Sequence, residues 1–383
     1  MTQAKQELTW LKEVASTPLQ QSLKDLERAY KNFFDSCKGK GQGIKIKPPK
    51  FKPKKSRQSA RFVGVNYKIG QDKIYLPKVG KIKIVLSREL SNKPTSLTII
   101  KDSANRYFAS FVVETNPETL PKTSNSTGID LGISTFATLS NGDKIEAPKP
   151  LKQNLKKLAK FQRKFPRTEK GSKRRERRRL RVAKLHAKIK DIRTDFLHKL
   201  STDLVKKYNT IVLEDLNVSG MVKNRKLAKA ISDLGWRQFR TLTEAKCEKY
   251  AREFRTISRW EPTSQKCSNC GFKGGKKELN VREWTCLNCG TLHDSLRLTG
   301  GYRDINAAIN ILEVIQPKTK VETTEAKVIE TPVQLSLFNE VAEGRSETIK
   351  RTQSHRKSSP KKDANGNDVS TRPESTIQLR LFD

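Results

Sequence analysis

Alternation of apolar and polar residues is the main pattern between residues 59 and 114. Short segments with a period of two, broken by Gly, Asn, Lys or Pro, are typical of half-buried antiparallel strands. The pattern predicts a small antiparallel barrel or curved sheet, followed by a turn-rich linker over 116–127. The five predicted strand segments are 61–67, 72–77, 80–86, 96–101 and 107–114.

The pattern becomes a mixture of strands and helices after residue 127. Segments 127–134 and 135–147 predict two adjacent strands, with a turn at Asn141-Gly142. The apolar segment 210–216 predicts a short buried strand that ends in two acids, and 255–260 is a further strand candidate. Residues 224–254 and 302–315 have helical spacing. Together with the strand-rich part, this predicts an α+β, multidomain protein.

Two apolar stripes at helical spacing predict further helices. The first follows Thr17-Pro18, a favourable N-cap with proline at the first helical position, and we expect it to face a core. Its members are Leu19, Leu23, Leu26, Tyr30 and Phe33. The second stripe lies on a long helix and comprises Leu185, Ile189, Ile192, Phe196 and Leu200.

The net charge of the chain indicates what kind of partner it binds. The chain has 383 residues with 79 Lys and Arg against 40 Asp and Glu, a net charge of +39, and only 34% hydrophobic residues. Such an excess opposes compaction unless a polyanion is bound, so nucleic acid is the expected partner. No apolar run is long enough for a membrane span. The first residues show no leader pattern, so we expect a cytoplasmic, nucleoid-associated protein of a bacterium or archaeon.

The positive charge is concentrated in two segments. Residues 38–57 contain nine Lys and Arg and no acid, and residues 151–200 contain 20 against four acids. We predict phosphate contacts from both, although a solvated linker is an alternative for the first. The candidate nucleic-acid-binding residues are Lys45, Lys47, Lys50, Lys52, Lys173, Arg174, Arg175, Arg177, Arg178 and Arg179.

Four of the six cysteines form two Cys-x-x-Cys pairs separated by 15 residues. The spacing predicts a structural zinc ribbon at about 261–293, and the glycines after each pair suit a knuckle turn. Four protein ligands leave no open position, so this zinc is not expected to be catalytic. The predicted ligands are Cys267, Cys270, Cys286 and Cys289.

Three acids far apart in the sequence are candidate ligands of divalent cations. Asp130 lies within an apolar strand, Glu214 ends another, and Asp304 opens the helix near 302. Alone, each has an ordinary alternative as a turn acid, a strand-end acid or an N-cap. If the three acids converge, they could bind two metal ions about 3.5–4 Å apart. Such a pair of ions activates a water molecule that attacks a phosphodiester bond.

The order of GIDLG, IVLEDL, the two cysteine pairs and RDINAAINIL resembles the TnpB family, transposon-encoded relatives of type V CRISPR effectors. The resemblance covers about 59–315. It implies an RNase H-like (RuvC) domain with Asp130, Glu214 and Asp304 as the Mg²⁺- or Mn²⁺-binding triad. It also implies a wedge-type barrel, a helical recognition part, and cleavage of a target DNA that a guide RNA selects.

The resemblance leads to a domain prediction and leaves alternatives open. We predict a helical segment at 1–37, the basic loop and barrel at 38–126, the nuclease at 127–315 and a disordered tail at 316–383. The chain begins late relative to family members, and residues 295–302 separate His293-Asp294 from Arg303-Asp304. Asp294 is therefore the alternative third ligand. A nuclease-inactive nucleic-acid-binding protein and an unguided RuvC-like resolvase or transposase are the alternative functions.

The tail contains the pattern Gln-Leu-x-Leu-Phe twice. Exposed Leu and Phe in a disordered tail imply a partner that buries them, although chance or strands folding back are alternatives. The pattern resembles the pentapeptide by which bacterial polymerases and repair proteins dock on the DNA sliding clamp, which makes the clamp a candidate partner. The residues concerned are Gln334, Leu335, Leu337, Phe338, Gln378, Leu379, Leu381 and Phe382.

Overall fold

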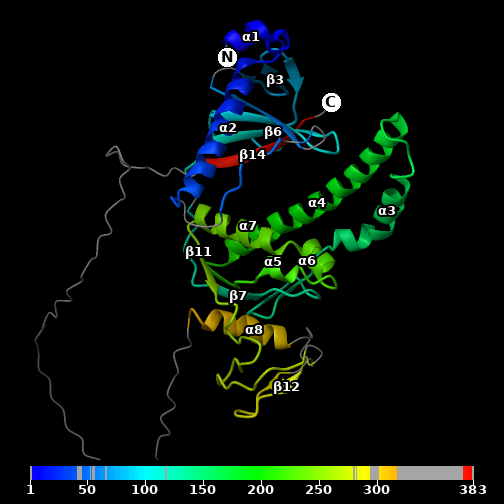
Figure 1. Ribbon diagram of the computed structural model, residues 1–383. Helices are drawn as coiled ribbons and strands as arrows, with labels where there is room; N and C mark the ends of the chain where they lie inside the picture. Colours follow the sequence, from blue (N-terminus) through cyan, green and yellow to red (C-terminus); the bar gives the residue numbers. More distant parts are fainter. Residues whose placement is uncertain are drawn as a thin grey trace, which may run out of the picture. The chain divides into compact units, whose positions relative to one another are not determined.

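The fold was obtained as a computed structural model, shown as a ribbon in Figure 1. All of the residues that it describes belong to one compact unit. The described residues are 2–40, 45–51, 53, 57–64, 67–116, 119–278, 281, 283–293, 302–316 and, as backbone alone, 374–381.

Two antiparallel sheets form the strand-rich part that the alternation predicts. One has the order β1-β5-β6-β14 and the other the order β2-β3-β4. Both contribute to one core, in which Phe62, Ile74, Leu97 and Phe111 are buried, so the alternating residues of two sheets face each other. The strands are β1 (Gln58–Val63), β2 (Lys68–Ile69), β3 (Lys73–Leu76), β4 (Gly80–Lys83), β5 (Ser96–Lys101), β6 (Tyr107–Glu114) and β14 (Glu374–Leu381).

Strand β14 corrects the prediction of a disordered tail. Residues 374–381 pair antiparallel with β6, from Glu374 opposite Glu114 to Leu381 opposite Tyr107. Thr-Ile-Gln-Leu-Arg-Leu alternates polar and apolar residues, which is a common pattern in strands, and β6 offers a sheet edge. The prediction of disorder is therefore wrong for these eight residues, while the rest of the predicted tail after residue 316 lies outside the described residues.

The first helices are α1 (Thr2–Glu7), the 3₁₀ helix η1 (Thr9–Lys12) and α2 (Ser16–Cys37). Helix α2 confirms the prediction of a helix after Thr17-Pro18, but its expected burial is wrong. No residue of α2 is buried, and Leu23, Leu26 and Tyr30 are all more than 40% exposed. Helical spacing establishes that a stripe exists, whereas burial requires a facing element.

The second part is built on a mixed sheet with the order β11-β10-β7-β8-β9. Strand β10 runs parallel to both β7 and β11, and β8 and β9 continue the sheet antiparallel. The predicted turn at Asn141-Gly142 joins β8 to β9, with Gly142 at a φ of +95°. The strands are β7 (Ser126–Asp130), β8 (Ala137–Leu139), β9 (Lys144–Ile145), β10 (Thr210–Glu214) and β11 (Glu253–Ile257).

Helices cover both faces of this sheet (Figure 1). Ile211 and Leu213 of β10 pack in a core with residues of α4, α6 and α7, whereas Val212 packs on the other face against Ile311 of α8. A central strand with both faces covered needs an apolar middle, which Ile211, Val212 and Leu213 supply in β10. The helices are α3 (Pro150–Lys164), α4 (Lys173–Lys207), α5 (Val218–Met221), α6 (Ala228–Leu234), α7 (Trp236–Lys249) and α8 (Tyr302–Glu313).

The four cysteines lie between β11 and α8, in a small unit with the two-stranded sheet β12 (Trp284–Thr285) and β13 (Leu292–His293). This unit is the zinc-ribbon segment that the sequence predicts, and we call it the ribbon. Within the described residues, no helix is both long and apolar enough to cross a membrane.

Candidate functional site

Two of the predicted acids end neighbouring strands. Asp130 is the last residue of β7 and Glu214 the last residue of β10. These strands are parallel, with Leu213 opposite Ile129, so the next residue of each strand is one of the two acids. Parallel strands bring their carboxyl ends to the same edge of a sheet. Asp130 and Glu214 therefore occupy adjacent positions at one edge, although 83 residues separate them in the sequence.

The third acid lies on a helix that packs against the same strand. Asp304 is in the first turn of α8, four residues before Ala308. A Cβ at Gly128 of β7 would lie only 2.2 Å from the Ala308 carbonyl oxygen and 2.7 Å from the Leu312 nitrogen. This glycine thus allows direct contact between the backbones of α8 and β7, two residues before Asp130.

The structure does not close the three carboxylates into a single ligand cluster. Within the described part of the chain, only the four predicted cysteines place three or more candidate donor atoms within 4.8 Å of one another. Asp294, the alternative third ligand, lies outside the described residues.

Glu214 and the adjacent Asp215 have opposite electrostatic environments. Burial raises the pKa of Glu214, and Asp215 adds to this effect while Arg259 opposes it. Asp215 instead accepts ion-paired hydrogen bonds from Arg259 and Arg240, which lower the pKa of its carboxyl group. The charge of Asp215 is therefore neutralised by two arginines. Glu214 is instead a partly desolvated carboxylate, which a bound cation would stabilise.

A cavity of about 380 Å³ opens beside Glu214. Its wall includes Arg237 and Arg240 from α7 and Arg259 from the segment after β11, with Glu244 as a second acid. Nothing in the sequence distinguishes these arginines from the many others in the chain. Their spacing is not a motif, and only the fold places α7 and the end of β11 beside Asp215. The wall of this cavity therefore combines a carboxylate, which suits cations, with guanidinium groups, which suit anions.

The ribbon presents its four thiols in a geometry that fits zinc. The Sγ atoms of Cys267 and Cys289 are 3.8 Å apart, and those of Cys270 and Cys286 are 3.6 Å apart. Tetrahedral zinc with bonds of about 2.3 Å requires sulfur atoms roughly 3.8 Å apart. The soft sulfur donor set and the spacing therefore both suit this ion.

The two cysteine pairs have the same backbone turn. The amide of Gly271 donates to the Cys267 carbonyl oxygen and that of Gly290 to the Cys286 carbonyl oxygen, both at 2.9 Å. Both glycines have positive φ, +78° and +67°, as the sequence predicts. The ribbon is thus built from two equivalent knuckles.

Hydrogen bonds favour the thiolate form at one exposed cysteine. The Thr291 hydroxyl group and backbone lower the pKa of the Cys289 thiol to about 6. A thiol with this pKa is largely a thiolate at neutral pH, which is the form that binds metal. Burial has the opposite effect at Cys267, where it raises the pKa to about 11. A bound cation would favour the thiolate form of Cys267.

Comparisons with known proteins show the family to which the chain belongs. The family model OrfB_IS605, described as "Probable transposase", matches residues 110–225, and the model "Cas12f1-like, TNB domain" matches 236–311. A relative from Streptomyces pristinaespiralis, named "Putative RNA-guided DNA endonuclease", is 44% identical over 80% of this chain and 73% of its own length. The chain belongs to the TnpB family.

Two further comparisons are more distant. The TnpB relative from Escherichia coli K12 with the name "Putative RNA-guided DNA endonuclease InsQ" is 32% identical over 80% of this chain and 76% of its own length. A solved Cas12f1 complex with sgRNA and target DNA is 15% identical, with a TM-score of 0.39, over 67% of this chain and 59% of that one.

The candidate nucleic-acid-binding residues of this TnpB-family chain fall into two groups. Some are exposed, and others, which we call committed, contact other parts of the protein. Arg175 lies over the Phe165 ring at 4.6 Å, Arg178 donates to the Lys164 carbonyl oxygen, and Arg179 pairs with Glu176. The contacts of Arg175 and Arg178 hold the turn between α3 and α4, whereas the pair of Arg179 with Glu176 lies within α4. Lys173, Arg174 and Arg177 are exposed in the first turns of α4, as are Lys45, Lys47 and Lys50 in the basic loop, whereas Lys52 lies outside the described residues.

Of the two tail repeats, the one at Gln334–Phe338 lies outside the described residues, as does Phe382 of the second. Gln378, Leu379 and Leu381 lie in β14, where the backbone pairs with β6.

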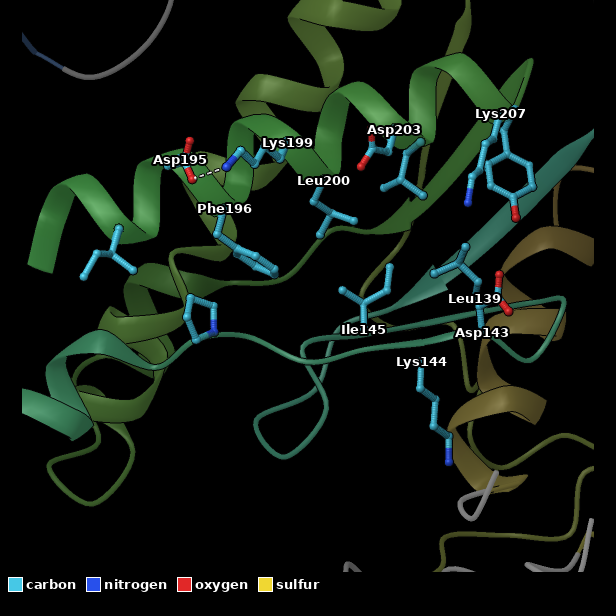
Figure 2. Close-up of a pocket in the computed structure, with 14 residues that line it drawn as sticks. Leu139, Asp143, Lys144, Ile145, Asp195, Phe196, Lys199, Leu200, Asp203 and Lys207 are labelled. Carbon is cyan, nitrogen blue, oxygen red and sulfur yellow. Dashed lines mark ion pairs between the residues drawn. The ribbon is translucent and has the colours of Figure 1, made fainter. Parts of the chain in front are cut away.

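A second cavity, of about 630 Å³, lies between α4 and the β8–β9 hairpin (Figure 2). Its rim alternates in charge, with Lys199 paired to Asp195 at 2.8 Å, and its floor includes Phe196 and Leu200. None of the three predicted catalytic acids lines it. The cavity is therefore separate from the candidate site at the sheet edge.

Proposed function

We propose that this chain is the RNA-guided DNA endonuclease of a transposon and cuts phosphodiester bonds at the edge where β7 and β10 end. The observation that carries the proposal is the adjacency of Asp130 and Glu214 on paired parallel strands. Membership of the TnpB family and the names of its two relatives support guidance by RNA and action on DNA.

In this proposal the mixed sheet with α8 is an RNase H-like, RuvC-type nuclease. Asp130, Glu214 and Asp304 hold Mg²⁺ or Mn²⁺, for which hard carboxylate oxygens are suitable ligands. When bound, the cations activate water and stabilise the leaving oxygen of the phosphodiester. The raised pKa of Glu214 fits this role, because a desolvated carboxylate gains most from a cation.

The other elements bind or support nucleic acid. Arg240 and Arg259, oriented by Asp215, face the cavity beside Glu214 and neutralise the phosphate there. The antiparallel sheets are the wedge-type barrel, and the exposed Lys and Arg of α4 and of the basic loop bind phosphates of the guide RNA or of its duplex with DNA. Zinc in the ribbon has a structural role.

The test is cleavage by protein purified with RNA transcribed from the transposon end. Target DNA should be cut only with the matching RNA and with Mg²⁺ or Mn²⁺. Asp130→Asn, Glu214→Gln and Asp304→Asn should each abolish cutting and retain binding, because Lys and Arg carry the affinity. Asp203→Asn, an exposed acid of the separate cavity, is the matched control.

The alternatives are distinct outcomes of this test. RNA-directed binding without any cutting would identify a nuclease-inactive nucleic-acid-binding protein. Cutting that ignores the RNA sequence would identify an unguided nuclease. Loss of cutting in Asp294→Asn but not in Asp304→Asn would transfer the third ligand to Asp294.

The sliding clamp remains a separate prediction about the tail. A peptide of residues 330–383 should bind the purified bacterial clamp, with higher avidity from two motifs than from one. Binding that persists after Leu337→Ala, Phe338→Ala, Leu381→Ala and Phe382→Ala together would contradict this prediction, as would no binding at high micromolar concentration.

A further inference from the structure

Two buried asparagines of α8 clasp the first zinc knuckle. The Asn306 side chain accepts from the Ser268 amide at 2.8 Å and donates to the Lys266 carbonyl oxygen at 2.8 Å. The Asn310 side chain donates to the Thr263 and Lys266 carbonyl oxygens at 2.7 and 2.8 Å. These contacts surround Cys267, and we call Asn306 and Asn310 the clasp.

Two buried asparagines are unfavourable in a helix, so their presence in α8 needs a reason other than helix formation. Asparagine is a poor helix former, and a buried amide is unfavourable unless it is hydrogen-bonded. Yet Asn306 and Asn310 are 1% and 2% exposed, and they lie one turn apart on α8. They share two acceptors, the carbonyl oxygens of Thr263 and Lys266, and Lys266 immediately precedes the first predicted zinc ligand. The two residues are therefore suited to orient the knuckle.

A third contact attaches the start of α8 to the ribbon. The Arg303 guanidinium donates to the Glu278 carbonyl oxygen at 2.5 Å and to the Val281 carbonyl oxygen at 3.2 Å. Arg303 directly precedes Asp304 in the sequence. The ribbon thus holds α8 on both sides of Asp304, at 303 and at 306.

Another face of the same helix rests on the sheet. Ala308 and Leu312 approach Gly128, whereas Asn306 and Asn310 bind the ribbon. Helix α8 is therefore fixed between β7, which ends in Asp130, and the zinc knuckle. Asp304 therefore lies on a helix that is held by contacts on two of its faces.

We propose that Asn306 and Asn310 are positioning residues, which couple zinc in the ribbon to the place of Asp304 at the nuclease site. The inference rests on the proposed function for the role of Asp304. The contacts predict reciprocity, because coupling between two sites must act in both directions. Zinc should strengthen cation binding at the acids, and a cation there should slow the loss of zinc.

The test measures release of zinc to a colorimetric chelator from the intact protein, with and without high Mg²⁺. We use Mg²⁺ because it binds thiolates poorly. In the parent, Mg²⁺ should slow zinc release several-fold. The double variant Asn306→Ala with Asn310→Ala should release zinc about tenfold faster or more, the usual effect of losing groups that support metal ligands, with no response to Mg²⁺.

Two further variants isolate the coupling. Asp304→Ala should lose the response to Mg²⁺, measured against the same variant's own release rate without Mg²⁺. Asn154→Ala is the matched control, since Asn154 donates to Pro150 within α3 and should behave as the parent does. If the double variant does not fold, each single variant supplies the same comparison. Alanine favours helix, so faster release cannot come from weaker helix propensity.

Cleavage is measured separately, so the two proposals can fail separately. Zinc release from the clasp variants at the parent rate would overturn the clasp, whatever the cleavage result. A parent that cuts DNA with Mg²⁺ but shows no Mg²⁺ effect on zinc release would overturn the coupling. In a third outcome, the parent neither cuts DNA nor responds to Mg²⁺, but the clasp variants still release zinc faster. This result would overturn the proposed function and the coupling, and only the role of the clasp in holding the knuckle would stand.

Discussion

Gly128 and Ala308 pack backbone to backbone: the Ala308 carbonyl oxygen lies only 2.2 Å from where a Cβ atom on Gly128 would be. Gly128→Ala should therefore push α8 off β7 and destabilise the protein by about 1–3 kcal/mol, the usual cost of overpacking. Denaturant unfolding measures this change. Gly70→Ala is the control, because its Cβ would approach only the Lys73 carbonyl oxygen, at 3.4 Å. Equal stability of the two variants would contradict the close packing.

The raised pKa of Glu214 predicts a pH-dependent effect of its neutralisation. A carboxyl group whose pKa is raised by folding stabilises the fold in its protonated form, and this contribution is lost as pH rises through the folded pKa. Without divalent cations, Glu214→Gln should thus be more stable than the parent at pH 7, with the difference shrinking towards pH 4. Thermal melts across this range measure it. A variant less stable than the parent at pH 7 would contradict the desolvation of Glu214.

Asp215 should show the opposite behaviour. Its pKa is lowered by Arg259 and Arg240, so its contribution to stability is present at neutral pH and is lost as pH falls through the folded pKa. Asp215→Asn should be less stable than the parent at pH 7, and the two should converge in acid. Thermal melts of the parent and the variant across the same pH range measure this difference in stability. The loss should also shrink with added salt, since the ion pairs are partly exposed.

Zinc should be bound at about one ion per chain. Replacing any one of Cys267, Cys270, Cys286 and Cys289 with Ser should lower both zinc content and stability, because metal binding in such ribbons contributes folding free energy. Elemental analysis with thiol titration measures this. Cys37→Ser is the control, since Cys37 is exposed at the end of α2. Purified parent without zinc and with all thiols reactive would refute the site.

The start of α4 should contribute to nucleic-acid affinity through three residues rather than six. Replacing Lys173, Arg174 and Arg177 with Gln should reduce the slope of log affinity against log salt by roughly 2 to 3, about one unit for each lost phosphate contact. Replacing the committed Arg175, Arg178 and Arg179 should instead lower stability. An unchanged salt slope in the first variant would mean that these side chains are only solvated.

The sequence by itself determined many of the elements of this protein and which four cysteines come together. The period-two segments became β1, β3, β4, β5 and β6, and the cysteine spacing identified the four thiols that lie together. Both depend on residues close in sequence, where backbone geometry sets which side chains share a face or a turn. The acids Glu214 and Asp304 were likewise recognisable by their places at a strand end and a helix start.

Only the tertiary structure decided which elements face one another. The exposure of Leu23 and Leu26 depends on what lies opposite α2. The pairing of residues 374–381 depends on the edge of β6, which lies at residues 107–114, far earlier in the chain. The arginines around Asp215 and the clasp on the knuckle are likewise contacts between elements. Such contacts join residues with no shared local pattern, so only packing of the whole chain reveals them.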